Sequence, residues 1–232
     1  MSDEETPTPS PIRDALIVGA SRGLGRAIAE AYADRGARVV GTVRNPDSEP
    51  PTGVETERLD LTDPAQIAAL RARLDGRRFD LLFVVAGVSL APRWQAGAET
   101  SDDDFDTVMR TNVLGVMRTV EALQDLVDPA GTIAVMSSGQ GSVANNTSGG
   151  FEVYRASKAA LNQLFRSYAA RHADDARSLL LLAPGWVQTG MGGPGAPLTI
   201  DESVPALLDT IDRRRGVAGL AYLDRNGDTV AW

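Results

Sequence analysis

The sequence predicts a single α/β domain built on a doubly wound parallel sheet. Three observations predict it. Apolar segments of strand length alternate with segments of helical periodicity, the first strand runs directly into a glycine-rich turn and a helix, and residues 81–87 are almost continuously apolar. With 232 residues and 43% hydrophobic content, the chain is large enough for one well-filled domain and short for two. We therefore expect one domain over residues 13–232.

Composition limits the chemistry that the chain can perform. It contains no cysteine, which excludes disulfides, thiolate nucleophiles and cysteine-based metal sites. Its one histidine, His172, cannot form a metal cluster by itself, and we expect it to be solvated or to cap a helix end. The net charge of −8 disfavours nucleic acid as a partner, because affinity for nucleic acid depends largely on neutralising phosphates. Small-molecule chemistry without a metal is favoured.

The first twelve residues differ from the rest of the chain. Residues 1–12 are acidic and rich in Ser, Thr and Pro, without an apolar run, and we expect them to form a disordered tail. They lack the apolar region of a signal peptide, and no apolar stretch of the chain approaches the ~20 residues that cross a bilayer. We therefore expect a soluble, cytoplasmic protein with no membrane partner.

The domain opens with a strand, a glycine turn and a helix. Residues 15–18 form an apolar strand that runs into Gly19-Ala20-Ser21-Arg22-Gly23-Leu24-Gly25, and a helix continues through Tyr32. Glycines permit a tight turn and the close approach of a ligand, and the free N–H groups at the start of a helix attract a pyrophosphate. Residues 38–43 form a second strand that completes a β-α-β unit. The pattern therefore indicates a Rossmann-type dinucleotide site.

The end of the second strand indicates which dinucleotide binds. An NAD enzyme usually has Asp or Glu there, about twenty residues past the glycines, to hold the ribose 2′-hydroxyl. This chain has Arg44 at that strand end and Arg22 within the glycine turn. Two guanidinium groups can hold a 2′-phosphate through charge-assisted hydrogen bonds, so the expected cofactor is NADP(H). The alternative is that both are ordinary surface charges among 22 arginines.

The remaining elements continue the alternation of strands and helices. Asp63 and Pro64 are expected to cap and start a helix that runs to Leu74, and the acidic run at 101–104 to start another that reaches about Leu126. Further strands are expected at residues 54–59, 81–87, 132–136 and 178–182. Ligands of such a sheet bind at the carboxyl ends of its strands. The residues expected to meet there are Gly19, Gly87, Ser138 and Gly185.

One pair of side chains has a clear chemical use. Lys158 is the only lysine in the chain, and it follows Tyr154 by four residues on a segment of helical periodicity, so both side chains reach the same small volume. A nearby cation favours the phenolate of a tyrosine, whose ordinary pKa is about 10. The pair therefore suits proton transfer to or from an alcohol or carbonyl oxygen, unless it is simply a surface Tyr and Lys. Asn112 is likewise open between a solvated and a functional position in its helix.

Several motifs fall at the expected strand or helix ends. They are the glycine turn 19–25, Asn112-Val113-Leu114-Gly115, Ser137-Ser138, the run YRASKAALN from Tyr154 to Asn162, and Pro184-Gly185-Trp186-Val187-Gln188-Thr189. With these motifs, the chain from about Asp14 to Trp232 resembles the short-chain dehydrogenase/reductase family, and most closely its C-factor-like carbonyl reductases. The resemblance implies NADP(H)-dependent, reversible hydride transfer to a small carbonyl or alcohol substrate. It also implies a homo-oligomer, a dimer or tetramer.

The resemblance assigns roles to individual residues. Ser138 would hydrogen-bond the substrate oxygen, and Tyr154 would donate the proton. Lys158 would bias Tyr154 toward its phenolate and bind the nicotinamide ribose, and Asn112 would hold a water. These four residues form the expected catalytic set. Thr189 would hold the nicotinamide carboxamide, and Asp60 would lie beside the adenine ring. The remaining cofactor contacts that the resemblance implies are Gly19, Ser21, Arg22, Gly23, Leu24, Gly25, Arg44, Leu61, Ala86, Gly87, Tyr154, Lys158, Pro184, Gly185 and Val187.

Two positions depart from the family pattern. Val85 stands where the family usually has Asn before Ala-Gly, and Gly190 stands where Asp commonly follows the Thr. Substrate contacts are expected from residues 88–94, 140–151 and 186–197, and the segment 190–195 is either a closing lid or a flexible connection. A second functional class also stays open, namely a dinucleotide-binding regulatory or signalling protein with vestigial reductase activity.

Overall fold

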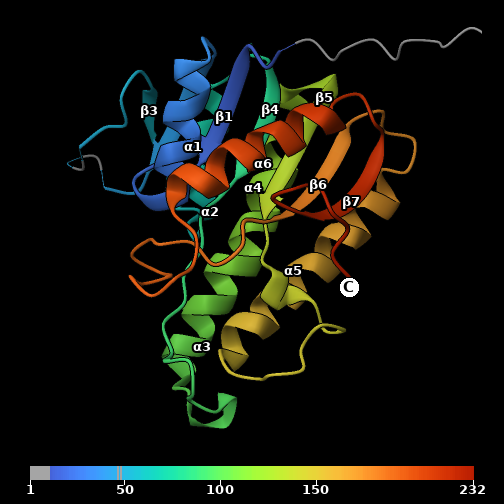
Figure 1. Ribbon diagram of the computed structural model, residues 1–232. Helices are drawn as coiled ribbons and strands as arrows, with labels where there is room; N and C mark the ends of the chain where they lie inside the picture. Colours follow the sequence, from blue (N-terminus) through green and yellow to red (C-terminus); the bar gives the residue numbers. More distant parts are fainter. Residues whose placement is uncertain (1–10, 46, 48) are drawn as a thin grey trace, which may run out of the picture.

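The computed structural model describes residues 11–45, 47 and 49–232, and one parallel β-sheet runs through its centre (Figure 1). The sheet has seven strands in the order β3-β2-β1-β4-β5-β6-β7, and every neighbouring pair is parallel. The chain first builds outward from β1 to β3, then returns beside β1 and builds toward β7, which confirms the doubly wound topology. The strands are β1 (Asp14–Val18), β2 (Arg38–Val43), β3 (Glu55–Arg58), β4 (Phe79–Val84), β5 (Val127–Met136), β6 (Ser178–Ala183) and β7 (Gly219–Asp224).

Helices cover both faces of the sheet (Figure 1). One face carries α1 (Gly23–Asp34) and α6 (Ile200–Arg214), and the other carries α2 (Pro64–Arg73), α4 (Val116–Leu123) and α5 (Glu152–Arg171). The remaining helical segments are α3 (Asp102–Met109), the π-helical η2 (Arg110–Gly115), and the 3₁₀ turns η1 (Gly97–Glu99), η3 (Gln124–Leu126) and η4 (Gly139–Gly141).

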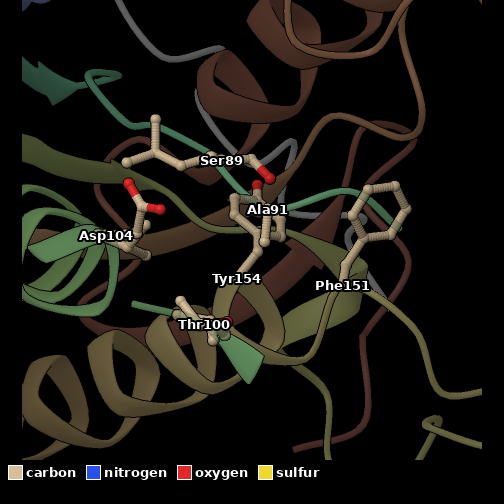
Figure 2. Close-up of a pocket in the computed structure, with 9 residues that line it drawn as sticks. Ser89, Ala91, Thr100, Asp104, Phe151 and Tyr154 are labelled. Carbon is tan, nitrogen blue, oxygen red and sulfur yellow. The ribbon is translucent and has the colours of Figure 1, made fainter. Parts of the chain in front are cut away.

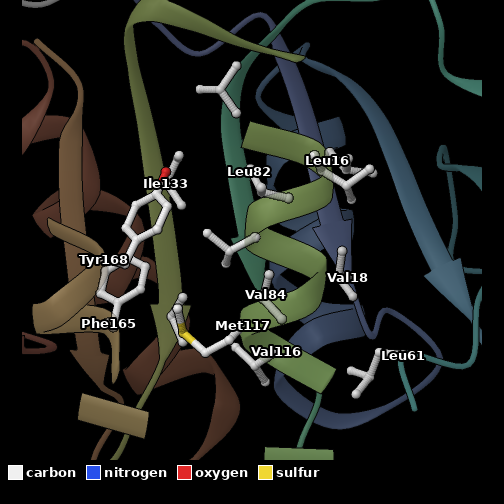
Figure 3. Close-up of a cluster of buried hydrophobic side chains, with 14 of the residues drawn as sticks. Leu16, Val18, Leu61, Leu82, Val84, Val116, Met117, Ile133, Phe165 and Tyr168 are labelled. Atoms are coloured by element: carbon white, nitrogen blue, oxygen red, sulfur yellow. The ribbon is translucent and has the colours of Figure 1, made fainter. Parts of the chain in front are cut away.

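Each face of the sheet has its own hydrophobic cluster. Figure 3 shows the cluster beneath α4, where Leu16 of β1 and Leu82 of β4 lie beside the helix and Val84 of β4 lies near Val116. The intervening residues Ile17 and Phe83 belong to the cluster that α1 and α6 cover. Because successive side chains of a strand point to opposite faces, burial of both faces makes every position of these strands apolar. That arrangement explains the near-continuous apolar runs in the sequence.

The helix expected from residue 101 to about 126 is built in four pieces. α3 ends at Met109, η2 follows as a π-helical segment, and α4 and η3 complete the element. A π-helical turn carries an extra residue within an otherwise α-helical path. The insertion changes the phase of the helix without changing its composition, so hydrophobic periodicity alone did not reveal it. Asn112 lies within this π-helical segment.

The structure contains a seventh strand and a sixth α-helix that the sequence pattern did not predict. β7 pairs with β6 from Ser178 opposite Gly219 to Ala183 opposite Asp224. α6, which precedes it, begins with a capping box formed by Thr199 and Glu202. The apolar part of β7 is limited to residues 220–223, between Gly219 and Asp224, and follows the charged end of α6, so it is weak as a sequence signal.

The N-terminal end of the described chain is more ordered than expected. Ile12, predicted to belong to the disordered tail, is 7% exposed and packs into the cluster beneath α1, because its apolar side chain can still reach the core. Residues 1–10 of that expected tail lie outside the described residues.

His172, expected to be solvated or to cap a helix end, is the C-cap residue of α5, and its ring lies 4.4 Å from that of Tyr168. No helix in the described part of the chain is long and apolar enough to span a membrane.

Candidate active site

The glycine turn after β1 packs tightly against the end of β4. Gly19 has a φ of 95°, and a Cβ added there would lie 2.8 Å from the main-chain nitrogen of Ala86. A Cβ on Gly25 would lie 2.0 Å from the carbonyl oxygen of Gly19. Both positions therefore require glycine. Thr42 of β2 fixes the turn, because its hydroxyl accepts a hydrogen bond from Gly19 N at 3.1 Å and its carbonyl oxygen accepts one from the next residue, Ala20, at 2.7 Å.

The start of α1, like those of α4 and α5, lacks the side-chain cap that α2, α3 and α6 have. Asp63, Ser101 and Thr199 accept hydrogen bonds from main-chain N–H groups in the first turns of α2, α3 and α6. Arg22, the N-cap residue of α1, makes no such bond. The first N–H groups of a helix have no partner within the helix. Those at the start of α1 are therefore available to a bound anion.

Two arginines border this uncapped helix start. Arg22 and Arg44 are exposed, and within residues 11–45, 47 and 49–232 neither guanidinium has an ion-pair or hydrogen-bond partner. Arg26, one turn further along α1, differs because it pairs with Glu30 at 3.0 Å. Asp60, at the end of β3, accepts hydrogen bonds from the main-chain nitrogen and the hydroxyl of its near neighbour Thr62 at 2.9 and 2.6 Å. The edge of the glycine turn thus carries two positive charges that no side chain in the described part of the chain neutralises.

Asn112 is fully buried, so the solvated alternative for this residue is wrong. Its amide oxygen accepts a hydrogen bond from Val88 N at 2.8 Å, and its amide nitrogen donates to Val88 O at 2.8 Å and to Ser157 Oγ at 3.0 Å. Both amide hydrogens are used, whereas the oxygen keeps one lone pair. Asn112 therefore joins the segment after β4 to α5.

Lys158 lies in the same buried region. It is 2% exposed, and its Nζ donates a hydrogen bond to Met136 O, at the end of β5, at 2.8 Å. A Cβ added to Gly87 would lie 3.5 Å from this Nζ and 3.3 Å from the amide oxygen of Asn112, so the three residues are close neighbours. Burial lowers the pKa of Lys158 to about 8. The ammonium is therefore still charged at neutral pH, but it loses its proton far more readily than an exposed lysine.

Tyr154 and Ser138 face each other across the same region. Burial raises the pKa of Tyr154, and its hydrogen bond with Ser138 partly opposes that rise. The expected lowering by Lys158 is not found: Lys158 does not contribute to the shift, its Nζ lies 5.8 Å from the centre of the Tyr154 ring, and it donates to Met136 instead. Desolvation of the phenolate outweighs the hydrogen bond. Tyr154 is accordingly a protonated acid at neutral pH.

A small pocket opens beside Tyr154 (Figure 2). Its walls come from the segment after β4, from α3 and from the start of α5, and most of the lining atoms are apolar. The lining residues are Ser89, Leu90, Ala91, Thr100, Asp104, Val108, Phe151, Val153 and Tyr154. Within the described residues, Phe151 is the one non-glycine residue with a positive φ, at 50°. Its main-chain nitrogen donates to Arg93 O at 2.7 Å, which ties the two walls together.

The segment after β6 is held by its own hydrogen bonds. Trp186 Nε1 donates to Gly192 O at 2.8 Å, and Gly192 N donates to Thr189 Oγ1 at 3.1 Å. Gln188 Nε2 donates to Ala196 O at 2.9 Å. The side chain of Thr189 also lies against the glycine turn, 3.7 Å from the position of a Cβ on Gly23. These contacts place Thr189, the residue expected to hold the nicotinamide carboxamide, beside the start of α1.

The other expected cofactor residues line the same edge of the sheet. Leu61 is buried and lies so close to the π-helical segment that a Cβ on Gly115 would be 2.1 Å from its Cδ1. Val187 is buried and Gly185 is exposed, with a φ of 84°. Val85, which stands where the family usually has Asn, donates a hydrogen bond from its main-chain nitrogen to Val18 O of β1 at 2.9 Å. The segment after β4 is therefore still joined to the sheet at this position. The half-buried residues are Ser21, Gly23, Leu24, Ala86 and Gly87, and Pro184 is buried.

The structure brings the four expected catalytic residues together from three parts of the fold: η2, the turn after β5, and α5, which carries both Tyr154 and Lys158. Tyr154 meets Ser138 directly, and Asn112 and Lys158 meet beside Gly87. Two further residues take part that the sequence did not identify: Ser157, which hydrogen-bonds Asn112, and Tyr222, which hydrogen-bonds the main chain of Ser138. Ser157 was visible within the motif but had no assigned role. Tyr222 had no local signal, because it is distant in sequence from every motif.

Comparisons with known proteins agree with this arrangement. The family model of the short chain dehydrogenases matches residues 13–196. The C-signal protein of Myxococcus xanthus is 36% identical over 155 residues, which cover 66% of this chain and 92% of that protein. This relative supports in part the expected resemblance to C-factor-like proteins.

Solved structures are similar over nearly the whole chain. A short-chain dehydrogenase/reductase from Burkholderia multivorans with bound NADP is 52% identical, with a TM-score of 0.92, and the match covers 96% of this chain and 100% of that one. A carbonyl reductase from Pseudomonas aeruginosa PAO1 in complex with NADP is 35% identical, with a TM-score of 0.86, covering 95% of this chain and 100% of that one. The similarity therefore includes both the glycine turn and the residues around Tyr154.

Proposed function

The chain belongs to the short-chain dehydrogenase/reductase family, and from that premise we propose that it is an NADP(H)-dependent oxidoreductase that interconverts a small carbonyl compound and its alcohol. One observation carries the proposal. Tyr154, held in its protonated form by burial, meets the Ser138 hydroxyl beside an apolar pocket and one helical turn from a buried lysine. An acid next to a second hydroxyl and a buried cation suits proton transfer to a carbonyl oxygen.

The residues of the glycine turn fit a phosphorylated dinucleotide. The turn leaves no space for side chains at Gly19 and Gly25, and the start of α1 offers N–H groups to a pyrophosphate. Arg22 and Arg44, which have no partner among the described residues, supply cations for a 2′-phosphate. The two similar structures with bound NADP support the same cofactor for this chain. Thr189, beside the turn, would hold the carboxamide of the nicotinamide.

In the proposed reduction, the cofactor supplies the hydride and the protein supplies the proton. Tyr154 donates its phenolic proton to the substrate oxygen as that oxygen becomes an alkoxide. Ser138 donates a hydrogen bond to the same oxygen and stabilises its developing negative charge. In the reverse direction, Tyr154 accepts the proton of the alcohol. The raised pKa of Tyr154 favours the direction in which it begins as an acid.

Lys158 and Asn112 would support proton transfer by Tyr154. The Lys158 ammonium lies 5.8 Å from the centre of the Tyr154 ring, and it can hydrogen-bond a ribose hydroxyl. Asn112 fixes Val88 and Ser157 with three hydrogen bonds and keeps one lone pair on its oxygen, near Lys158. That lone pair can accept a hydrogen bond from a water that returns protons to Lys158.

The pocket beside Tyr154 has a volume of about 10 Å³, room for about one water-sized group, so its lining contacts only a small part of any substrate. Asp104 is the one charged residue among its lining residues, and it is negative. An anionic substrate would be repelled there, whereas an uncharged one would bury apolar surface. Exposed apolar side chains also gather on the three segments that follow β4, β5 and β6; they are Leu90, Trp94, Val143, Trp186 and Met191. We therefore favour aldehydes, ketones or quinones with an apolar or aromatic group beside the carbonyl.

Assembly into a dimer or tetramer remains part of the proposal. Phe105, Leu114 and Leu164, on α3, η2 and α5, are each more than two-fifths exposed and offer apolar surface to a second copy. Light scattering coupled to size exclusion would give the mass directly. A monomer at every concentration would contradict this part of the proposal alone.

The decisive test of the function is an NADPH oxidation assay on the full chain. A panel of neutral aromatic aldehydes, ketones and quinones should contain members that are turned over, and carboxylate-bearing analogues should be poorer substrates. Tight NADPH binding without turnover of any member would favour the alternative of a dinucleotide-binding regulator. Absence of NADPH binding would contradict both functions.

A further inference from the structure

Tyr222, on β7, contacts the catalytic turn in a way that the proposed mechanism does not use. Its side chain is 2% exposed, and its phenol donates a short hydrogen bond to the main-chain oxygen of Ser138. Burial raises the pKa of Tyr222, and interactions with Asn162 and Ser137 partly oppose that rise. The phenol therefore remains a hydrogen-bond donor across the neutral range.

The turn that carries Ser138 is also fixed to α5. Ser137 Oγ donates to Asn162 Oδ1 at 2.6 Å, and Asn162 Nδ2 donates to Gly141 O at 3.4 Å. Asn162 lies one helical turn after Lys158, and a Cβ on Gly141 would be 3.0 Å from the Lys158 Cβ. α5 thus holds the two ends of η4, whereas the carbonyl oxygen of Ser138 accepts hydrogen bonds from Gly141 N at 2.8 Å, within the turn, and from the side chain of Tyr222, on β7.

A second aromatic residue holds Tyr222 in position. The Trp232 ring lies 5.5 Å from the Tyr222 ring at an angle of 57°, and the Arg166 guanidinium lies 4.6 Å from the centre of the Trp232 ring. Ala144 N donates to the main-chain oxygen of Trp232 at 2.9 Å. The segment from β7 to Trp232 therefore contacts the chain on both sides of η4, at Ser138 and at Ala144.

We propose that Tyr222 is a positioning residue for the reaction, and that it acts by fixing the orientation of Ser138. The inference rests on the function proposed above. The hydroxyl of Ser138 accepts a hydrogen bond from Gln140 N at 3.2 Å and meets Tyr154, so its direction depends on the peptide plane that follows Ser138. Tyr222 holds that plane through its carbonyl oxygen, which Gly141 N also contacts, and supplies the side-chain hydrogen bond that comes from outside the turn. A hydroxyl displaced by about 1 Å would align poorly with the substrate oxygen, and such errors can lower turnover by up to about a hundredfold.

Tyr222→Phe tests the proposal because it keeps the ring on Trp232 and removes only the donor. We expect kcat for carbonyl reduction to fall about tenfold, with the Kd for NADPH changed less than twofold. Tyr168→Phe is the matched control. Tyr168 is also fully buried, on α5, and its phenol donates to Gln124 Oε1 at 2.6 Å, away from the catalytic turn. The two variants should lose similar thermal stability, whereas only Tyr222→Phe should lose turnover.

A double-mutant cycle with Ser138→Ala separates positioning from general structural damage. With the hydroxyl absent, its orientation no longer matters, so Tyr222→Phe should lower kcat less than twofold in the Ser138→Ala background. The residual turnover is measured at high enzyme concentration. An equal loss in both backgrounds, or an equal loss in Tyr168→Phe, would overturn the positioning role.

The same cycle distinguishes this inference from the function beneath it. If Ser138→Ala leaves turnover intact, the proposed mechanism is wrong and the role of Tyr222 is overturned with it. If Ser138→Ala impairs turnover and Tyr222→Phe does not, the mechanism stands and only the positioning role fails.

Discussion

The two halves of the site are built in opposite ways. Around Tyr154, polar groups bond to one another: Asn112 makes three hydrogen bonds, Lys158 donates to Met136, and Ser138 is held through its carbonyl and its hydroxyl. Around the start of α1, the helix has no side-chain cap, and the two nearest arginines have no partner within the described residues.

The difference matches the demands of the two tasks. Proton transfer requires groups held at fixed distances before the substrate arrives. Binding of a phosphate requires donors and positive charge that nothing in the protein already uses. In the part of the chain that the structure describes, Asn112, Lys158 and Ser138 have partners where we propose the chemistry, although the side-chain oxygens of Thr100 and Gln140 there have none. Arg22, Arg44 and the start of α1 lack partners where we propose that an anion binds.

The largest expected effect is on kcat and comes from the half of the site around Tyr154, where the polar groups already bond to one another. Tyr154→Phe removes the proton donor and should lower kcat by about a thousandfold, within the range of general acid–base catalysis. The Kd for NADPH, measured by fluorescence titration, should stay within about twofold. Near-normal turnover would mean that Tyr154 is not the acid.

Arg44→Asp should have the next largest effect, a change of cofactor preference at the half of the site around the start of α1. A hydrogen bond involving a charged group contributes about 1.5–3 kcal/mol, so Arg44 should favour NADPH over NADH by roughly ten- to a hundredfold. The carboxylate would repel the 2′-phosphate and accept a hydrogen bond from the ribose of NADH. We expect the ratio of kcat/KM for the two cofactors to reverse. An unchanged ratio, or a wild-type protein that uses both cofactors equally, would contradict the role of Arg44.

Lys158→Met should stabilise the protein while it removes turnover. The fall in the pKa of Lys158 from its usual 10.5 to about 8 corresponds to a burial cost of about 3 kcal/mol at pH 7, and the lost bond to Met136 offsets about 1 kcal/mol. Between pH 8 and 10.5 the unfolded lysine binds more protons than the folded one, so this group makes wild-type stability rise with pH.

Chemical denaturation of both proteins at pH 7 and pH 9.5 measures this effect. The variant should be more stable by about 2 kcal/mol at pH 7, and the difference should shrink at pH 9.5. A difference that grows with pH would contradict the burial of a charged Lys158.

Arg22→Asp should have the smallest effect and sharpens the comparison most finely. Arg22 already has the extended backbone of an N-cap residue, with φ −163° and ψ 171°. A carboxylate there can cap α1 and should raise the free energy of unfolding without cofactor by about 1 kcal/mol. It should also weaken NADPH binding, because it occupies the N–H groups and repels phosphate.

Thr199→Ala is the matched control for that variant. It removes the cap of α6 and should lower stability by about 1 kcal/mol without affecting NADPH affinity. If Arg22→Asp stabilises the protein and leaves NADPH affinity unchanged, the start of α1 does not bind the phosphates.

How much of this could be read from the sequence also differs between the halves. The glycine turn and both arginines are contiguous or at a strand end, so local pattern was sufficient to predict them. Asn112, Ser138, Tyr154 and Lys158 were predicted by motif, and the sheet brings them together. Their electrostatics was not predictable, because the pKa of Tyr154 depends on burial, which only the tertiary structure sets.

The contributions that escaped prediction are those made by distant parts of the chain. Tyr222 follows Ser138 by 84 residues and meets it only because β7 completes the edge of the sheet. The π-helical turn that directs Asn112 inward changes helical phase by one residue, which leaves no mark in composition. Ile12 was assigned to the tail because its neighbours are polar, although its own side chain is buried.

Amide hydrogen exchange with and without NADPH tests the central comparison most directly. The N–H groups of Gly23, Leu24 and Gly25 begin α1 without a cap and should exchange at least about tenfold more slowly when NADPH is bound. Gly141 N and Ser142 N already donate to Ser138 O and Gly139 O, and their exchange should change by less than about twofold. Protection that appears at Gly141 and Ser142 but not at the start of α1 would contradict a preformed catalytic half and an open cofactor half.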